Sequence, residues 1–310
     1  MIVVTGSCGF IGKNLVDRLR YMGHEVLGID PNEKEGIHPT KFSDWWWANS
    51  HRVEAVYHLG ANADTMEKDW QVLETMNVNF SKIVWYSCYM DNVPLVYASS
   101  AAVYGNGEFG FSDCDHLINK LEPMNLYGKS KLEFDKFTLA QKNSPSFWAG
   151  LRFFNVYGCG EQHKGRMASM VYHGYKQIHE TGYIKLFKFG EQQRDFVYID
   201  DIINVMLWMV KYRPKSGIYN VGTGIARSFT SLAKALFVAM DKPLRIKYIN
   251  MPDDIKDQYQ FFTKACIDKL RDAGYDKSFQ PIEQGVLDCV QKFKINEDYY
   301  KSMESEFKKW

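Results

Sequence analysis

Apolar residues follow two different spacings in the first 30 residues, and each spacing predicts a different element. Residues 2–4 form a β-branched run typical of a buried strand. Residues 11–21 carry apolar side chains at helical spacing, and residues 25–30 return to the strand pattern. These segments predict one strand–helix–strand unit, which is the building block of a parallel sheet.

The same alternation continues to about residue 158. The further elements that it predicts are strands over 53–59, 94–98 and 148–156 and helices over 78–90 and 127–139. Alternation of this kind predicts an α/β fold with a doubly wound, mostly parallel sheet of the Rossmann type. Ligands of such sheets lie at the carboxyl ends of the strands.

Beyond residue 158 the pattern becomes mixed. It predicts helices over about 166–181, 201–211, 228–240 and 282–293, with short strands near 184–189 and 245–249. We therefore expect a dinucleotide-binding Rossmann domain over 1–158, with a later contribution from about 194–221. Residues 159–310 are expected to form mainly a smaller substrate lobe. The run Trp45, Trp46 and Trp47 is interpreted as a helix or turn packed partly against the sheet edge.

Composition excludes several classes of protein. The 310 residues are 45% hydrophobic and 24% charged, with a formal net charge of +1, which argues against binding driven by nucleic-acid or membrane-surface charge. No apolar run approaches the roughly 20 residues that span a bilayer, and no basic leader is recognised, so we expect a cytoplasmic protein. The six cysteines lack a paired spacing, and Cys114 with His116 is too small a set for a metal site. We expect free thiols and no metal.

The segment TGSCGFIG, residues 5–12, follows the first predicted strand and opens the first helix. Gly6 suits the tight turn, Gly9 lets the backbone approach phosphates, and Gly12 lets the helix pack closely on the strand. A pyrophosphate would then bind at the helix N-terminus. The spacing therefore predicts a bound dinucleotide.

Asp30 ends the second predicted strand, where a carboxylate can accept hydrogen bonds from the adenosine ribose. A 2′-phosphate beside this carboxylate would be repelled, which favours NAD. Lys34 and Lys41 lie just downstream and can counter that repulsion, so NADP stays open.

Tyr127 and Lys131 are four residues apart and share one face of a predicted helix. A free phenol has a pKa of about 10, and a nearby ammonium favours the phenolate. Lys131 can also hold the nicotinamide ribose, and Ser100 can supply a second hydrogen bond to a substrate oxygen. These residues predict a nicotinamide-dependent redox enzyme.

Several longer segments carry a resemblance that extends from residue 1 to about 293. They are YASSAAVYG at 97–105, LYGKSK at 126–131, FFNVYG at 153–158, HKGRMAS at 163–169, RDFVYIDD at 194–201 and QYQFFTKACIDKLRDAGYDKSF at 258–279. The chain resembles the extended short-chain dehydrogenase/reductases that act on nucleotide sugars. Within that family, the HKG and AGYDK segments are most similar to the ADP-heptose 6-epimerases.

The resemblance implies that Tyr127 and Lys164 are the two acid/base catalysts, supported by Lys131 and Ser100. The residues that it implies on the dinucleotide, beyond the glycine motif and Asp30, are Phe10, Ile11, Gly60, Ala61, Asn77, Tyr127 and Lys131. Those that it implies on the nucleotide sugar are Asn155, Val156, Arg166, His173, Phe187, Arg194 and Tyr259.

The same resemblance implies a tightly bound NAD or NADP, one per subunit, and an ADP-heptose substrate. It also implies a homo-oligomer with a role in building lipopolysaccharide. The chain departs from those epimerases at Arg166, where they have serine, and at Gln258, where they have arginine. Residues 31–52 also form a shorter stretch here.

Other activities on this scaffold stay open at this point. Nucleotide-sugar 4,6-dehydratases carry an Asp-Glu pair just after the serine strand, and this chain has Ala101, Ala102 and Val103 there, which argues against dehydration. A 4-epimerase or a reductase needs no more than the serine, tyrosine and lysine. Lys164 favours the 6-epimerase over these. A non-catalytic dinucleotide sensor would not need the tyrosine and lysine pair.

Overall fold

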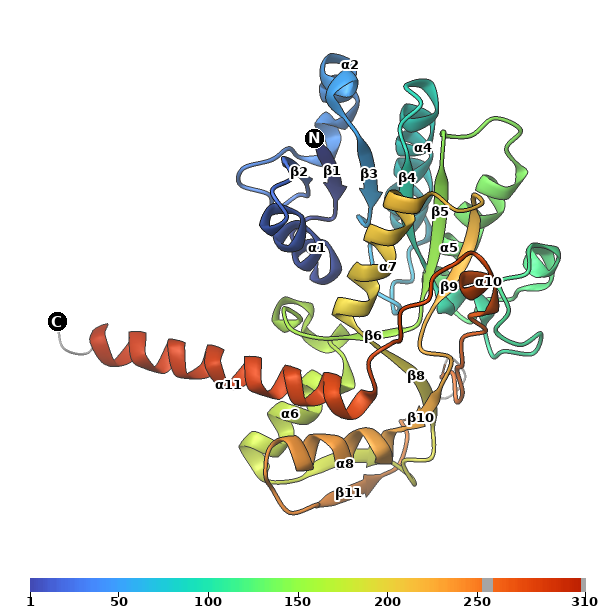
Figure 1. Ribbon diagram of the computed structural model, residues 1–310. Coiled ribbons are helices and arrows are strands. Elements are labelled where there is room, and N and C mark those ends of the chain that lie inside the picture. Colours follow the sequence, from blue (N-terminus) through green and yellow to red (C-terminus); the bar gives the residue numbers. More distant parts are fainter. Residues whose placement is uncertain (253–258, 308–310) are drawn as a thin grey trace.

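The computed structural model describes residues 1–252 and 259–307 of the chain (Figure 1). Its centre is a six-stranded sheet in the order β2-β1-β3-β4-β5-β9, and every pair of neighbours in it is parallel. The strands are β1 (Ile2–Thr5), β2 (Val26–Ile29), β3 (Ala55–His58), β4 (Leu95–Ser100), β5 (Trp148–Phe153) and β9 (Gly217–Val221). The predicted doubly wound parallel sheet is confirmed.

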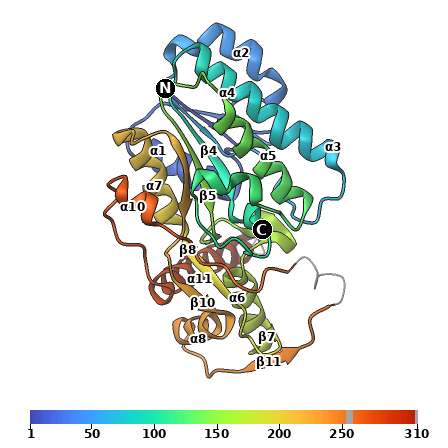
Figure 2. The same cartoon turned by 90° about the vertical axis from the view of Figure 1, so that its right-hand side faces the viewer.

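Helices cover both faces of this sheet (Figure 2). On one face lie α1 (Phe10–Tyr21) and α7 (Ile199–Tyr212), and on the other lie α2 (Phe42–Asn49), α4 (Phe80–Met90) and α5 (Leu126–Ala140). The alternation of side chains along β1 follows from this arrangement, because Val4 packs with Leu15 in one core and Val3 packs with Trp85 in the other. Apolar residues on both faces explain why the strand pattern is continuous rather than alternating.

Short helical turns connect these elements. They are the 3₁₀ turns Pro39–Lys41, Ser50–Arg52, Ala101–Tyr104, Asp115–Lys120 and Gln162–Met167, the short helix α3 (Trp70–Leu73) and a π-helical turn over Glu74–Asn79. The π turn lies directly before α4, and such turns are frequent at functional sites.

The rest of the chain builds two small sheets below the large one (Figure 1). One has the order β10-β8-β6, from β10 (Ala226–Ser228), β8 (Gln193–Tyr198) and β6 (Asn155–Tyr157), and the other pairs β11 (Ile246–Ile249) with β7 (Ile184–Phe187). The helices are α6 (Met170–Thr181), α8 (Phe229–Ala239), α10 (Asp268–Asp272) and α11 (Ile282–Phe307). None of the helices in the described residues is long and apolar enough to cross a membrane.

Three sequence-based boundaries are wrong. The strand predicted over 148–156 is two strands in different sheets, because the chain bends at Phe154, whose N–H donates to the carbonyl of Val221 at 3.1 Å. The helix predicted from 166 begins only after Ser169, because Gly165 has a φ of 52° and Ser169 caps the new helix. The last helix continues to residue 307 rather than ending at 293.

The tryptophan run lies in α2, as the interpretation of a partly packed helix predicts. Trp46 is buried and its indole N–H donates to Asp91 at 2.6 Å. Trp47 points to solvent with 89% of its surface exposed. One face of α2 therefore joins the core, and the other is open.

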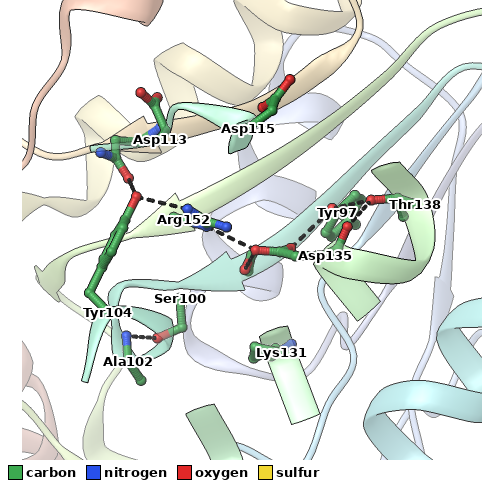
Figure 3. A network of polar contacts seen from close by, with 12 residues as sticks. Tyr97, Ser100, Ala102, Tyr104, Asp113, Asp115, Lys131, Asp135, Thr138 and Arg152 are labelled. Atoms are coloured by element: carbon green, nitrogen blue, oxygen red, sulfur yellow. Dashed lines mark hydrogen bonds and ion pairs between the residues drawn. The ribbon is translucent and has the colours of Figure 1, made fainter. Parts of the chain in front are cut away.

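A buried ion pair joins α5 to the sheet (Figure 3). Arg152 Nε on β5 donates to Asp135 on α5 at 2.9 Å, and both side chains are fully buried. The same carboxylate accepts hydrogen bonds from Tyr97 at 3.1 Å and from Ser99 at 3.0 Å, both on β4. Arg152 Nη1 also donates to the Tyr104 hydroxyl at 2.9 Å. This network fixes α5 on two strands.

We predict that Arg152→Met destabilises the protein by about 3–5 kcal/mol, because it leaves the Asp135 carboxylate buried without its partner. Urea or guanidinium unfolding measures the loss. The matched control is Lys269→Met, which breaks an exposed ion pair with Asp115 and is expected to cost about 0–1 kcal/mol. Equal losses in the two variants would contradict the role given to the buried pair.

Candidate active site

The turn between β1 and α1 forms a cradle of backbone atoms. Gly6 has a φ of 69°, and a Cβ there would lie 2.7 Å from the backbone nitrogen of Gly60. A Cβ on Gly12 would lie 2.0 Å from the Gly6 carbonyl oxygen. Gly9 is the N-cap of α1 and offers no side chain, so the first N–H groups of the helix stay open to a ligand. The cradle fits the pyrophosphate of a dinucleotide.

Two carboxylates lie at the end of β2, beside this cradle. Asp30 is 9% exposed and accepts hydrogen bonds from the N–H groups of Asn32 at 2.9 Å and Cys8 at 3.3 Å. Glu33 returns toward the turn, where Ser7 Oγ donates to it at 2.5 Å and lowers the pKa of its carboxyl group. This end of the site is acidic, whereas the side chains of Lys34 and Lys41 are exposed.

A chain of hydrogen bonds under the cradle fixes the end of β3. The Gly60 N–H donates to Thr5 Oγ1 at 3.0 Å, and Thr5 Oγ1 lies 2.7 Å from His58 Nδ1. His58 Nε2 lies 2.8 Å from Ser81 Oγ, which donates to the carbonyl of Asn77. Since the Ser81 proton is used, His58 carries its proton on Nε2 and accepts from Thr5 on Nδ1. Burial and, second, the charge of Lys131 lower the pKa of His58 to about 3.

Asn77 holds the loop that follows β3. Its Oδ1 accepts from the Asn62 N–H at 2.7 Å, and its Nδ2 donates to the Asn62 carbonyl at 3.0 Å and to Ser130 Oγ at 2.9 Å. Asn77 is almost completely buried in the π turn. It therefore connects the backbone of Asn62 to Ser130 on α5, while the preceding residues Gly60 and Ala61 remain partly exposed.

Ser100, Tyr127 and Lys131 lie close together, where β4 ends and α5 begins. Asn125 caps α5 by accepting from the Gly128 N–H at 2.8 Å, which places Tyr127 in the first turn. Lys131 Nζ donates to the Ala98 carbonyl at 2.9 Å and lies 5.9 Å from the centre of the Tyr127 ring. The three predicted side chains therefore form one group.

The surroundings of this group shift the pKa values of Tyr127 and Lys131. Burial raises the pKa of Tyr127, and a hydrogen bond with Ser100 opposes that rise. Ser100 Oγ already accepts from the Ala102 N–H at 3.1 Å, so its own proton is free to donate to the phenol oxygen. Burial lowers the pKa of Lys131 to about 8, and attraction to Asp135 opposes the change (Figure 3). The charged lysine favours the phenolate.

Lys164 approaches the cradle from a different element, the turn Gln162–Met167. Its Nζ lies 5.1 Å from the centre of the Phe10 ring, at the start of α1, and 3.4 Å from Glu161 Oε2. A second amine is thus placed near the N-terminus of the helix that carries the glycine cradle. Ile11 follows Phe10 and is partly buried.

Three of the predicted substrate residues form a cluster in the lower part of the molecule. The Arg194 guanidinium lies 5.0 Å from the ring centre of Tyr259, and the Tyr259 and Phe187 rings are 5.9 Å apart. Burial lowers the pKa of Arg194, which nevertheless stays charged at neutral pH. A buried cation between aromatic rings suits the phosphates and the base of a nucleotide.

The other predicted substrate residues are dispersed. Asn155 is exposed at the start of β6 and accepts from Thr263 Oγ1 at 3.3 Å, and Val156 follows it. His173 is partly buried on α6. Arg166 does not join the cluster, because it pairs with Asp64 at 2.6 Å. Gln258 lies outside the described residues.

The sequence analysis missed three buried polar residues of the site. They are His58 below the cradle, Asp135 beside Lys131 and Glu161 beside Lys164. Two of these residues could have been found from the sequence, because His58 ends a predicted strand and Asp135 follows Lys131 by one helical turn. Glu161 had none, since a glutamate in an irregular segment is more often exposed.

The described residues contain no cluster of three or more histidines, cysteines or carboxylates arranged to hold a metal ion. All six cysteines are free thiols. The residues of interest for the candidate chemistry are the serine, tyrosine and lysine group, Lys164 and the dinucleotide cradle.

A parallel doubly wound sheet, a glycine cradle and a Ser-Tyr-Lys group together define a dinucleotide-dependent enzyme. A model of the NAD dependent epimerase/dehydratase family matches residues 2–222, and the chain belongs to this family. Its members use an NAD-type cofactor, which the cradle fits.

Relatives are similar over nearly the whole chain. The ADP-L-glycero-D-manno-heptose-6-epimerase of Fusobacterium nucleatum is 44% identical and covers 97% of this chain and 100% of its own. The protein of the same name from Brachyspira hyodysenteriae is 40% identical, over 92% of this chain and 95% of its own. The crystal structure of the Helicobacter pylori ADP-L-glycero-D-manno-heptose-6-epimerase has a TM-score of 0.81 at 28% identity, over 94% of this chain and 95% of that chain.

We predict that His58 makes the protein less stable in mild acid. Its pKa is about 3 in the folded state and about 6.5 when unfolded, so only the unfolded chain takes up the proton as the pH falls between these values. Lowering the pH from 7 to 5 therefore reduces the free energy of unfolding by about 2 kcal/mol through His58. Chemical unfolding at both pH values measures this loss. The loss between pH 7 and pH 5 is expected to be about 2 kcal/mol smaller in His58→Gln than in the parent protein. An unchanged pH dependence in the variant would show that His58 titrates normally.

Proposed function

We propose that this protein is a nucleotide-sugar epimerase that interconverts ADP-D-glycero-D-manno-heptose and ADP-L-glycero-D-manno-heptose at C6. The observation that carries the proposal is that two side chains able to transfer a proton lie on separate elements, Tyr127 on α5 and Lys164 in the turn before α6. The name of the 44% identical F. nucleatum relative supports the same substrate.

A bound NAD supplies the chemistry that side chains lack, because it takes a hydride from C6 and returns it. The backbone around Gly6 and Gly12 would hold its pyrophosphate, Asp30 its adenosine ribose and Lys131 its nicotinamide ribose. The acidic pair formed by Asp30 and Glu33 supports NAD over NADP, since a 2′-phosphate would meet two carboxylates.

Tyr127 serves one orientation of the C6 oxygen. The hydrogen bond from Ser100 and the ammonium of Lys131 both favour its phenolate, which accepts the hydroxyl proton as C6 is oxidised. The O–H proton of the C6 hydroxyl would pass to Tyr127 and the C6–H hydride to the nicotinamide, so that the alcohol becomes a ketone.

Lys164 serves the other orientation. C6 of the heptose is exocyclic, so rotation about the C5–C6 bond turns the opposite face of the ketone toward the hydride without release of the nucleotide. The oxygen then points away from Tyr127, and Lys164 donates the proton that completes the alcohol. Each of the two acid/base groups, Tyr127 and Lys164, thus serves one of the two positions that the C6 oxygen takes.

The remaining predicted residues would hold the nucleotide sugar. In this proposal Arg194 pairs with the diphosphate, and Tyr259 and Phe187 contact the nucleotide. Further contacts would come from Asn155, Val156, His173 and Arg166. Because Arg166 pairs with Asp64 here, it must exchange that partner for substrate. We further propose, from the family resemblance, one tightly held cofactor per subunit of a cytoplasmic homo-oligomer.

The purified protein is expected to convert ADP-D-glycero-D-manno-heptose to its C6 epimer without net consumption of cofactor. Tyr127→Phe and Lys164→Met should each lower kcat by at least about 100-fold, the effect of removing a positioned acid or base. Chromatographic separation of the two epimers measures both rates. Lys129→Met, an exposed lysine on α5, is the matched control and should keep the rate of the parent protein.

Two results would overturn the proposal in different ways. Turnover of UDP-glucose at C4 without turnover of the heptose would make the protein a 4-epimerase, for which Ser100, Tyr127 and Lys131 suffice. Recovery of most of the rate of Lys164→Met at saturating substrate would make Lys164 a phosphate-binding residue.

The protein freed of cofactor is expected to bind NAD at least about tenfold more tightly than NADP. Asp30→Asn should narrow that ratio because it removes one of the two carboxylates at this end of the cradle. Calorimetric titration with both dinucleotides measures the ratio, and Asp17→Asn, an exposed carboxylate on α1, should leave it unchanged. Tighter binding of NADP would reverse the assignment and point to Lys34 or Lys41.

A further inference from the structure

We propose that Glu161 is a positioning residue for Lys164, which it holds at the N-terminus of α1 so that the amine meets the substrate oxygen. The inference rests on the proposed function, because it gives Lys164 a partner in that reaction. Glu161 follows β6 in an irregular segment, and its side chain is completely buried.

The carboxylate of Glu161 accepts hydrogen bonds from several groups of its own segment. Oε1 accepts hydrogen bonds from the Gly158 N–H at 3.2 Å and from Ser169 Oγ at 2.6 Å. Oε2 accepts from the Ser169 N–H at 2.6 Å and from Lys164 Nζ at 3.4 Å. One buried carboxylate therefore ties both ends of the segment together and reaches the lysine in between.

The lysine contact differs from the other three. The Gly158 and Ser169 groups are close and well placed, so they satisfy the buried carboxylate even when Lys164 is away. The lysine contact is the longest, and 26% of the lysine side chain is exposed. Lys164 is thus the one partner that is able to leave for a substrate oxygen while Glu161 stays fixed.

The segment is also fixed against the cofactor cradle. Asn14 on α1 donates to the carbonyl of Cys159 at 3.0 Å and to the carbonyl of Phe10 at 2.9 Å. Lys164 lies over the Phe10 ring at 5.1 Å. Both Glu161 and Phe10 therefore contact the amine, and its place is defined relative to α1, the helix that begins at the glycine cradle.

The other titratable groups near Glu161 form no ion pair with it in the described part of the chain. Cys159 lies on the same segment, and Cys289 faces it from α11. Lys292 of α11 donates to the Tyr198 hydroxyl at 3.1 Å and lies 4.0 Å from Asp200. Among the described residues, Lys164 is the only cation that forms an ion pair with Glu161.

The test compares Glu161→Gln with Ser169→Ala. The glutamine keeps the shape and removes the charge that attracts Lys164, whereas the alanine removes another contact of Glu161 and the cap of α6 but leaves the lysine pair. We expect Glu161→Gln to lower kcat by about 10- to 100-fold with KM changed less than about twofold, as for a misplaced acid/base group. Ser169→Ala should keep kcat within about threefold, although its melting temperature falls.

A double-mutant cycle separates positioning from a general structural role. In the Lys164→Met background, Glu161→Gln should change kcat by less than about twofold, because its effect passes through the lysine. An equal fractional loss in both backgrounds would overturn the proposal. If Glu161→Gln does not fold, Glu161→Asp, which keeps the charge and withdraws the carboxylate by one methylene, is measured in the same cycle.

A crystal structure of Glu161→Gln supplies a readout that needs no activity. We expect the Lys164 amine to leave the Phe10 ring while the Ser169 contact persists. An amine in its original place would overturn the proposal, even if the enzyme is active. Loss of the proposed epimerase function is seen separately, as absence of heptose turnover in the parent protein.

Discussion

The buried carboxylate of Asp135 is the interaction on which the arrangement of the site depends. It accepts hydrogen bonds from Ser99, the neighbour of Ser100, and from Arg152 on the next strand, and it lies one helical turn beyond Lys131. Its charge is satisfied only when α5 lies in its native register on the sheet, because β4 supplies Tyr97 and Ser99 as partners and β5 supplies Arg152. The helix that carries the tyrosine and lysine is therefore fixed on the strand that carries the serine.

The same network extends toward the lower part of the molecule. Tyr104, which accepts from Arg152, donates to Asn220 at 2.6 Å, and Asn220 Nδ2 donates to the carbonyls of Phe111 and Cys266. One set of buried polar groups thus connects α5, which carries the proposed proton-transfer residues, to the loops that border the proposed substrate region. Such networks rigidify a site because every unpaired member would be costly.

The bend at Phe154 gives the enzyme its second half. Up to this residue the chain follows the large sheet, and after it β6 pairs with β8 in a separate sheet (Figure 1). The change of sheet brings Lys164, from the segment after β6, to the start of α1, and it brings Arg194 on β8 beside the aromatic cluster. The residues proposed for proton transfer and substrate binding therefore come from chain segments on both sides of this bend.

The sequence by itself determined the parallel sheet, the glycine cradle and the pair formed by Tyr127 and Lys131. These depend on local rules, since apolar period, glycine spacing and residues one helical turn apart are set by neighbours in the chain. The tertiary structure alone decided the bend at Phe154, the pairing of Arg166 with Asp64 and the burial of Glu161. Each of these depends on a partner or a packing surface distant in sequence, and whether a charge is buried is known only when the groups that satisfy it are in place.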